Sequence, residues 1–231
     1  MTEFDNRGFI KGAPMHPDRW GKEITGVPSG RIIANHAAPP GILVVQNYVQ
    51  PSWCDGIISE CSSVAGTPIP DASMNGVGEV IKVQDIKTEV SPVLRQFFLA
   101  MLTQHFQTFF DWMETPEIFR YRSGEVQPRA DSEIWNSDEG QWSRVIDRDV
   151  CVHFFLNEDF EGGELYFPNF DFRISPLKGL MVAFPSDGRY VHSVLPIKKG
   201  YRFVITSSAV AVGSPRIQPS PPGNAMMLPK R

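Results

Sequence analysis

The second half of the chain is divided into short β-type segments, and this division constrains the fold more than any other feature of the sequence. Each segment is rich in Val, Ile, Phe or Tyr, and Gly, Pro, Asp and Asn separate one segment from the next. The segments cover 118–122, 150–156, 164–167, 172–174, 180–184, 190–194 and 201–210. Because each short strand must bury one face against a second layer, this spacing favours a sandwich or a double-stranded β-helix, the jelly roll.

Helical patterns precede the β-type region. Pro51 opens a segment in which Trp53, Ile57 and Cys61 fall on one side of a helix. From 92 to 113, apolar residues recur at steps of three and four. The sequence therefore predicts a mainly β fold with flanking helices, and the helix over 92–113 is expected to pack on the core.

The two ends of the chain have a different composition from the middle. Residues 1–40 are rich in Gly, Pro and charge without a sustained period, which predicts an irregular N-terminal arm. Residues 213–231 alternate Pro, Ser and Gly and predict an extended Pro-rich tail. The folded domain is expected over 41–212, and the arm and tail are candidates for self-association or assembly.

Charge and cysteine content exclude several classes of protein. The formal net charge of -4 provides no general basic field for nucleic acid. The first residues contain Asp5, Arg7 and Lys11 around short apolar pieces, so neither a signal peptide nor a membrane-spanning helix is expected. Three cysteines are an odd number without metal-type spacing, which argues against a disulfide framework. These features predict a cytoplasmic protein that does not bind membranes or nucleic acid.

Two stretches of the β-type region carry the chemistry. The first reads Asn-Glu-Asp-Phe-Glu-Gly-Gly-Glu-Leu-Tyr-Phe-Pro over 157–168, and His192 and Arg202 follow it in later β-type segments. The second reads Tyr-Arg-Ser-Gly-Glu-Val-Gln-Pro-Arg-Ala-Asp-Ser over 121–132. Each motif alone is weak, but their order along one chain is specific.

In this order the motifs resemble those of the prolyl 4-hydroxylase-like family of iron(II)/2-oxoglutarate-dependent dioxygenases, over about residues 41–211. The resemblance implies a jelly-roll fold, with Asp131 and His192 as iron ligands. It also implies that Arg202 binds the far carboxylate of 2-oxoglutarate and that Phe155 contacts this cosubstrate. Carboxylate and imidazole suit iron(II), and a guanidinium can pair bidentately with a carboxylate. Phe155 lacks the hydroxyl of the tyrosine often found there, and Leu165 replaces the usual Thr.

Arg129 departs from the family at the most sensitive position, where the first metal-binding histidine is expected. A guanidinium has no available lone pair and stays protonated, so it cannot replace an imidazole as a ligand. We expect Arg129 to form an ion pair with Asp131, two residues away, and metal affinity to fall or be lost.

His153 is a candidate for the missing ligand. Alternation along 148–156 places Cys151, His153 and Phe155 on one face of the strand. The family resemblance places the position of Phe155 inside the barrel, which brings His153 inside as well. The alternative is a barrel-lining histidine bonded to a neighbour. Two interpretations stay open for the segment 132–147: it is either a lid over the site or a surface loop.

The resemblance implies an enzyme, a hydroxylase that needs iron(II) and 2-oxoglutarate and acts on a small molecule or a peptide. The resemblance is also compatible with ascorbate as an accessory reductant. Because of Arg129, the alternative is a catalytically inactive homologue that serves as a binding or structural assembly subunit. A third hypothesis is a sensor that binds 2-oxoglutarate without turnover.

Overall fold

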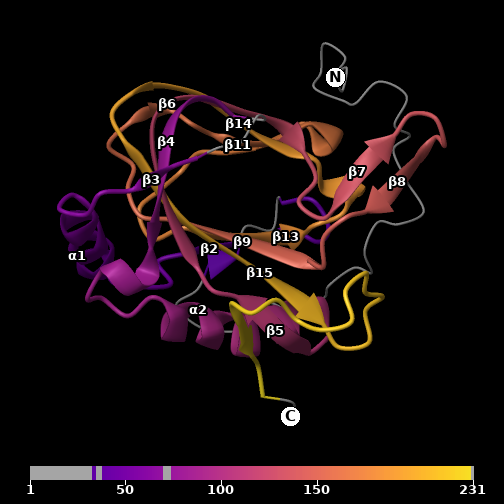
Figure 1. Ribbon diagram of the computed structural model, residues 1–231. Helices are drawn as coiled ribbons and strands as arrows, with labels where there is room; N and C mark the ends of the chain where they lie inside the picture. Colours follow the sequence, from indigo (N-terminus) through magenta and orange to yellow (C-terminus); the bar gives the residue numbers. More distant parts are fainter. Residues whose placement is uncertain (1–32, 35–37, 70–73, 230–231) are drawn as a thin grey trace.

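A curled antiparallel sheet dominates the computed structural model of the protein, which describes residues 33–34, 38–69 and 74–229 (Figure 1). Neighbouring strands of the main path follow the order β1-β2-β13-β9-β15-β6-β14-β11-β12. In chain order these strands are β1 (Ile33–Ala34), β2 (Leu43–Gln46), β6 (Glu117–Arg129), β9 (Val150–Phe155), β11 (Leu165–Phe167), β12 (Phe172–Ile174), β13 (Met181–Pro185), β14 (His192–Lys199) and β15 (Arg202–Ala211). The sheet curls so that β14 and β11 face β9 and β15 across the interior.

Further strands branch from this path. The strands off it are β3 (Thr67–Pro68), β4 (Met74–Lys82), β5 (Phe110–Glu114), β10 (Glu161–Gly162) and β16 (Ala225–Met227). A separate hairpin consists of β7 (Glu133–Asn136) and β8 (Gln141–Arg144). The predicted mainly β fold is confirmed.

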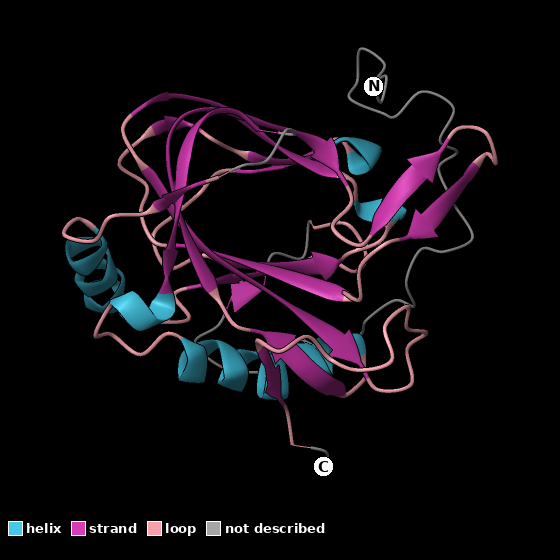
Figure 2. Cartoon of the chain, viewed as in Figure 1, coloured by secondary structure: helices cyan, strands magenta, loops and turns pink. Residues whose placement is uncertain are grey.

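Helices cover one outer side of the barrel (Figure 2). They are α1 (Pro51–Cys61), α2 (Ser91–Phe97), the π-helical η3 (Phe98–Leu102) and α3 (Thr103–Phe106), with the single turn η2 (Val83–Asp85). Two further turns, η4 (Pro168–Phe170) and η5 (Gly188–Tyr190), lie elsewhere in the chain. No helix among the described residues is long and apolar enough to span a membrane.

Strand β9 separates two apolar cores. Val152, Phe154 and Leu156 pack into the core that contains the helices, where the Trp53 ring of α1 stacks on Phe154 with centroids 5.4 Å apart. Cys151 and Phe155 belong to the second core, inside the barrel. Because side chains alternate along a strand, this division confirms the predicted faces of β9.

The predicted helix over 92–113 is wrong at its C-terminal end. The helical segments run from Ser91 to Phe106, and Gln107 then adopts a left-handed φ of 50°. The chain continues as β5, which buries Phe110 and Trp112, whereas Phe109 is exposed. A strand that follows a helix closely can continue its apolar spacing by chance, so the pattern did not indicate the boundary.

The segment 132–147, for which the sequence left open a lid or a surface loop, contains the β7–β8 hairpin. The Trp135 and Trp142 rings pair across β7 and β8 with centroids 5.7 Å apart. Glu133 Oε2 accepts a hydrogen bond of 2.8 Å from the Gly188 N–H, and a Cβ at Gly188 would collide with the Trp142 ring. The hairpin therefore packs against η5, the turn just before β14.

The C-terminal segment packs on its own chain as far as the structure describes it. Strand β16 pairs with β5, and Leu228 is buried in the core that contains the helices. The Asp147 carboxylate accepts hydrogen bonds of 3.0 Å from the backbone N–H groups of Ile217 and Gln218. Most of the predicted arm over 1–40, including His16 and His36, lies outside the described residues.

Candidate active site

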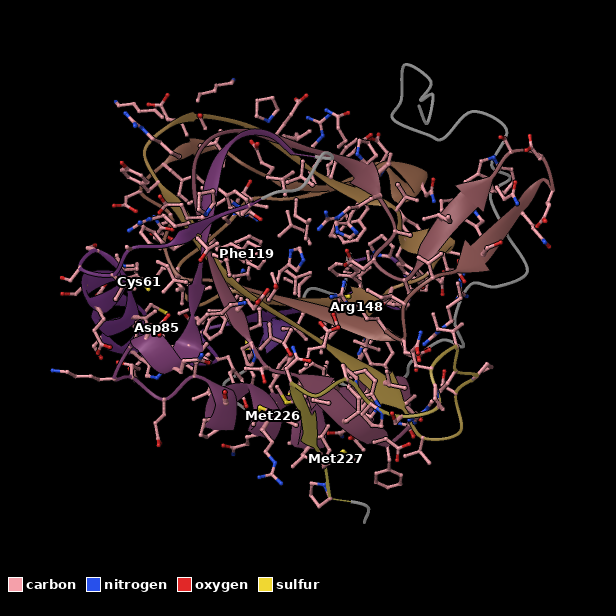
Figure 3. The ribbon with its side chains drawn as sticks, viewed as in Figure 1. Cys61, Asp85, Phe119, Arg148, Met226 and Met227 are labelled. Atoms are coloured by element: carbon pink, nitrogen blue, oxygen red, sulfur yellow. The ribbon has the colours of Figure 1, made fainter. Side chains whose placement is uncertain are left out.

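A cavity of about 260 Å³ lies between the two halves of the curled sheet. Its walls are the inward faces of β6, β9, β14 and β15, and the labelled side chains of Phe119 and Arg148 lie toward this interior (Figure 3). Directly paired residues of antiparallel strands point to the same face, so the register sorts the inward-facing residues into rows. The rows are Arg202 with Tyr121, Val204 with Phe119 and Phe155, Thr206 with Glu117 and His153, and Ser208 with Cys151.

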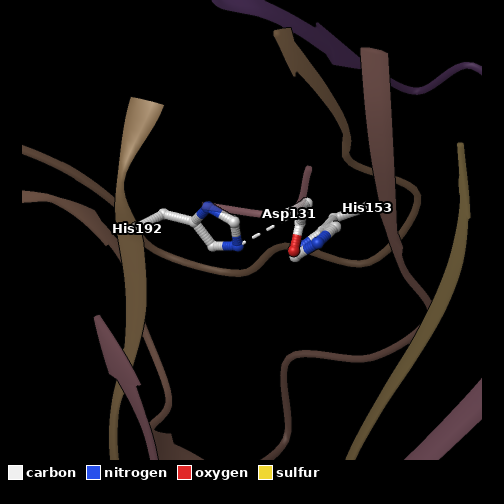
Figure 4. Close-up of side chains that lie close together, drawn as sticks. All are labelled: Asp131, His153 and His192. Atoms are coloured by element: carbon white, nitrogen blue, oxygen red, sulfur yellow. Dashed lines mark ion pairs between the residues drawn. The ribbon is translucent and has the colours of Figure 1, made fainter. Parts of the chain in front are cut away.

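Three possible metal ligands converge beside the third row (Figure 4). Asp131 follows the end of β6, His153 lies within β9, and His192 is the first residue of β14. One ligand atom from each lies within 4.8 Å of the other two. The structure therefore brings together the three side chains that the sequence nominated from three distant segments.

The backbone fixes the orientation of His192. Its Nδ1 lies 3.1 Å from the Tyr190 carbonyl, and its Nε2 lies 3.6 Å from Asp131 Oδ2. A carbonyl accepts a hydrogen bond from Nδ1–H, which assigns the lone pair to Nε2 on the side of the carboxylate. Histidines that ligate metals are commonly held in this way by a second hydrogen bond.

Electrostatics keep the three side chains in the protonation states that bind a metal. Burial of the Asp131 carboxyl opposes ionisation, but His192 and Arg129 hold its pKa well below the usual range. Burial lowers the pKa of His153 to about 3, with a further contribution from His192. Burial also lowers the pKa of His192, against the opposing effect of Asp131. One carboxylate and two neutral imidazoles therefore face each other at neutral pH.

Arg129, the last residue of β6, contacts the Asp131 carboxylate of the candidate metal site. It is directly opposite His192 in the pairing of β6 with β14, and its Nε lies 3.6 Å from Asp131 Oδ1. Its side chain is 41% exposed, whereas that of Asp131 is 8% exposed. The two carboxylate oxygens thus face different partners, Arg129 on one side and His192 on the other.

Arg202 provides a buried positive charge at the other end of the rows. The residue is 1% exposed, and its Nε and Nη2 have no hydrogen-bond partner in the part of the chain that the structure describes. The centre of the guanidinium lies 5.4 Å from the Tyr121 ring centroid and 5.1 Å from that of Phe155. Burial lowers the pKa of Arg202 to about 10, so the group stays charged at neutral pH. A buried cation with unused donors fits a carboxylate ligand.

The Gly162-Gly163 turn allows the backbone to pass close to Arg202. Gly162 and Gly163 have φ values of 80° and 70°, in the left-handed region that favours glycine. A Cβ at Gly163 would lie 3.1 Å from Arg202 Cδ, and one at Gly162 would lie 2.1 Å from the Pro196 carbonyl oxygen. The motif that identified the region therefore lets the backbone pass close to β14 and Arg202.

Sequence reasoning missed several residues of the cavity. Tyr121 was used only as part of a motif, although alternation along β6 places it on the same face as Phe119 and Glu117. Arg148 and Glu114 also line the cavity and form an ion pair of 2.7 Å. Asn224, from the segment predicted as a separate tail, is part of the same wall. No local pattern connects Asn224 with this site.

Comparisons with known proteins agree with this geometry. Residues 116–207 match the family model of the 2OG-Fe(II) oxygenase superfamily. Human prolyl 3-hydroxylase 2 is 36% identical over 63 residues, a match that covers 25% of this chain and only 9% of the human protein.

Solved structures with a similar fold include prolyl hydroxylases. The collagen prolyl hydroxylase of Paramecium bursaria Chlorella virus-1, solved as a 2-oxoglutarate complex, is 17% identical with a TM-score of 0.57, over 73% of this chain and 95% of that chain. The Trichoplax adhaerens prolyl hydroxylase, solved with a hypoxia inducible factor peptide, is 16% identical with a TM-score of 0.58, over 74% and 83%. A Pseudomonas putida prolyl-4-hydroxylase is 19% identical with a TM-score of 0.53, over 75% and 94%. The predicted jelly roll is confirmed.

Proposed function

We propose that this chain, which has the fold of the prolyl hydroxylases, is an iron(II)/2-oxoglutarate-dependent hydroxylase of the 2OG-Fe(II) oxygenase superfamily. The observation that carries the proposal is the convergence of Asp131, His153 and His192 within 4.8 Å. Two imidazoles and one carboxylate form the ligand set that iron(II) oxygenases use. His153 provides the second imidazole that Arg129 cannot provide.

The buried hydrogen-bond donors of Arg202 also fit the cosubstrate 2-oxoglutarate. Arg202 would bind one carboxylate of 2-oxoglutarate, because its Nε and Nη2 have no partner among the described residues. The Tyr121 and Phe155 rings hold the guanidinium in place, and Val204 and Phe119 keep the adjacent row apolar. When bound, iron(II) and 2-oxoglutarate supply an oxidative decarboxylation: dioxygen and 2-oxoglutarate give succinate and carbon dioxide, and the second oxygen atom enters a substrate C–H bond.

Other groups of the site orient the metal ligands and keep them in the protonation states that bind a metal. The Tyr190 carbonyl holds the His192 ring so that Nε2 faces the cavity. The low pKa of Asp131 keeps its carboxylate available as a ligand. Ascorbate as an accessory reductant and a cytoplasmic location stay predictions from the sequence.

An inactive homologue is the second candidate function, and the contact between Arg129 and Asp131 favours it. The guanidinium Nε lies 3.6 Å from Oδ1 and competes with a metal for the same carboxylate. In that case the chain would keep the jelly roll and serve as a binding or assembly subunit, in which its two ends contribute contacts.

Anaerobic titration with iron(II) and 2-oxoglutarate separates the two functions. The chelate of these two ligands produces a metal-to-ligand charge-transfer band, which reports binding without turnover. We expect the band in the unaltered protein and its loss in His153→Ala. The matched control His105→Gln changes a histidine of α3 outside the cavity and should retain the band.

The variant Arg129→His tests whether the protein is an inactive homologue. A band that appears only in this variant identifies a disabled oxygenase, and the second function then replaces the first. A band in the unaltered protein that survives His153→Ala shows that iron binds without His153, and the proposed ligand set is then wrong.

A further inference from the structure

The loop over 145–149 joins β8 to β9 and makes two sets of hydrogen bonds. One set reaches the backbone next to the candidate metal ligand Asp131. The other set reaches the C-terminal segment, residues 213–229. The same short loop therefore contacts both a part of the metal site and a segment more than 60 residues further along the chain.

The backbone at Asp131 is held from two directions. The Ser186 carbonyl accepts hydrogen bonds of 3.1 Å from the Asp131 N–H, 3.0 Å from the Ser132 N–H and 3.0 Å from the Ser132 hydroxyl. The Ser132 carbonyl accepts hydrogen bonds of 2.8 Å and 3.3 Å from the N–H groups of Val145 and Ile146. Because Asp131 follows β6 and is not part of it, these bonds set where its carboxylate lies.

Asp149 connects the Ser186 carbonyl group with the C-terminal segment. The backbone carbonyl of Asp149 accepts a hydrogen bond of 3.0 Å from the Ser186 N–H. Its carboxylate accepts hydrogen bonds of 2.8 Å from the Ala211 N–H and 2.8 Å from the Ser214 hydroxyl. A shift of Asp149 therefore moves Ser186, and with it the acceptor that holds Asp131.

Asp147 binds the next part of the C-terminal segment. Its side chain is 6% exposed, and its two oxygens accept hydrogen bonds of 3.0 Å from the backbone N–H groups of Ile217 and Gln218. Hydrogen bonds to an ionised carboxylate are roughly twice as strong as those between neutral groups. These two bonds hold the segment against the loop that contacts Ser132.

Arg144, the last residue of β8, bridges the two carboxylates. Its Nη1 donates a hydrogen bond of 2.8 Å to Asp149 Oδ1, and its Nε donates one of 3.3 Å to Asp147 Oδ1. Two carboxylates on one short loop repel each other, and a guanidinium between them offsets this repulsion. Arg144 therefore keeps both acceptors in place for the C-terminal segment.

The far end of the C-terminal segment reaches the cavity itself. The Asn224 carbonyl accepts a hydrogen bond of 2.6 Å from the Thr115 hydroxyl, and both residues line the cavity. Strand β16 then pairs with β5, and Leu228 is buried. The segment thus contacts the site at two places, the loop that holds Asp131 and the wall of the cavity.

We propose that docking of the C-terminal segment positions the metal ligand Asp131, and that Arg144, Asp147 and Asp149 are the positioning residues between them. This inference rests on the proposed function, because it concerns how the same metal site is held. Coupling between two sites is reciprocal, so the docked segment strengthens metal binding and a bound metal strengthens docking by the same factor. A merely structural role of these residues would stabilise the fold without this reciprocity.

Trypsin cleavage after Arg216 measures docking of the segment. The cleaved bond joins Arg216 to Ile217, whose N–H is bound by Asp147, so a docked segment is protected. We expect saturating manganese(II) to slow this cleavage in the unaltered full chain about fivefold to tenfold, within the usual range of coupling between sites. Mass spectrometry quantifies the fragment that begins at Ile217, and electron spin resonance measures the manganese(II) affinity of the same protein.

Variants of the bridge test the path. Arg144→Gln and Asp147→Asn should each speed cleavage after Arg216, weaken manganese(II) binding about fivefold to tenfold and abolish the protection by manganese(II). Arg144→Lys keeps the positive charge and should recover part of all three. Arg120→Gln is the matched control, because Arg120 has a similar exposure, 19% against 21% for Arg144, and pairs with Glu79 outside the cavity. It should change neither the cleavage nor the affinity.

The outcomes separate this inference from the proposed function. If manganese(II) binds the bridge variants as tightly as the unaltered protein, or binds without slowing cleavage after Arg216, the positioning role is wrong and the proposed function is unaffected. An equal loss of affinity in Arg120→Gln has the same meaning. The protection of the unaltered protein needs no variant, so it decides the case even if Arg144→Gln does not fold. If manganese(II) does not bind the unaltered protein, the proposed function fails and the positioning role fails with it.

Discussion

The two walls of the cavity hold their functional groups in different ways. The β9–β15 wall carries His153 within β9, Phe155 at the end of β9 and Arg202 at the start of β15. The β6–β14 wall carries Arg129, Asp131 and His192 where strands end or begin. In the described structure, His153 Nδ1, Arg202 Nε and Arg202 Nη2 have no hydrogen-bond partner, whereas Asp131 and His192 contact each other and further groups.

This difference indicates which groups need a ligand most. On the β9–β15 wall the buried polar atoms carry a desolvation cost that a bound ligand can offset. On the β6–β14 wall a ligand must compete with contacts that already exist, above all with Arg129 on Asp131. We therefore expect changes on the first wall to have the larger effects on cosubstrate binding and on stability.

Arg202→Met should show the largest effect. Truncating one partner of a buried charged pair costs about 2–5 kcal/mol, which lowers the affinity for 2-oxoglutarate at least about thirtyfold. The same change removes a buried cation that has no described hydrogen-bond partner for Nε and Nη2, so the ligand-free protein should become more stable by about 1–3 kcal/mol. Calorimetric titration and urea unfolding measure the two quantities. Arg122→Met is the matched control, and a loss of both affinity and stability would contradict the comparison.

The second prediction concerns acid and His153. Its pKa of about 3 in the folded protein lies below the usual 6.5 of an unfolded chain, so the unfolded state binds more protons between these values. The stabilising difference is fully present above pH 6.5 and is lost as the pH falls toward 3, by an amount on the order of a few kcal/mol. Asp131, His192, Arg129 and Arg202 face this imidazole, and Asp131 alone among them favours its protonation.

Urea unfolding at pH 7.5 and pH 5.0 checks this prediction. His153→Gln should lose less stability between the two pH values than the unaltered protein does, because one titrating group has been removed. His192 should account for part of the remaining loss, since its pKa is lowered in the same direction. An unchanged pH dependence in the variant would show that His153 is not a buried neutral imidazole.

The difference between the walls also explains what the sequence could predict. The alternation of β9 is a local pattern, so the shared face of Cys151, His153 and Phe155 was predicted from 148–156 alone. The strand over 172–174 was predicted with its observed bounds for the same reason. By contrast, β4 and the pairing of β16 with β5 depend on partners far along the chain. No local period indicates such partners.

The candidate site also combines residues that the sequence could nominate with distances that it could not predict. The order of motifs nominated Asp131, His192 and Arg202, but the distance between His153 and His192 depends on how tightly the sheet curls, which no residue pattern specifies. Their ring centroids lie 5.6 Å apart. Tyr121 was missed because it belongs to the motif over 121–132, which was interpreted only as a turn. Asn224 was missed because it belongs to the predicted tail.

The third prediction tests how η5 supports the β6–β14 wall. A Cβ at Gly188 would lie 2.2 Å from Cδ2 of Trp142, so Gly188→Ala must displace either the hairpin or η5. Tyr190, at the end of η5, holds the His192 ring, and losing such outer support typically costs about tenfold or more in metal affinity. Manganese(II) binding followed by electron spin resonance measures this loss. Adding Trp142→Ala makes room for the new methyl group and should restore the affinity; a double variant as weak as Gly188→Ala would contradict the assigned contact.

The smallest expected effect is that of Arg129→Gln on metal affinity. Removing the guanidinium frees Oδ1 of Asp131 from an ion pair at 3.6 Å, so manganese(II) should bind more tightly. The gain should be only about twofold to fivefold, because the Arg129 side chain is 41% exposed and solvent screens its charge. Arg129→Lys keeps the charge and should bind manganese(II) as the unaltered protein does. A gain of a hundredfold or more would mean that Arg129 blocks the site, and the chain would then be a disabled oxygenase in which the β6–β14 wall has lost its metal-binding role.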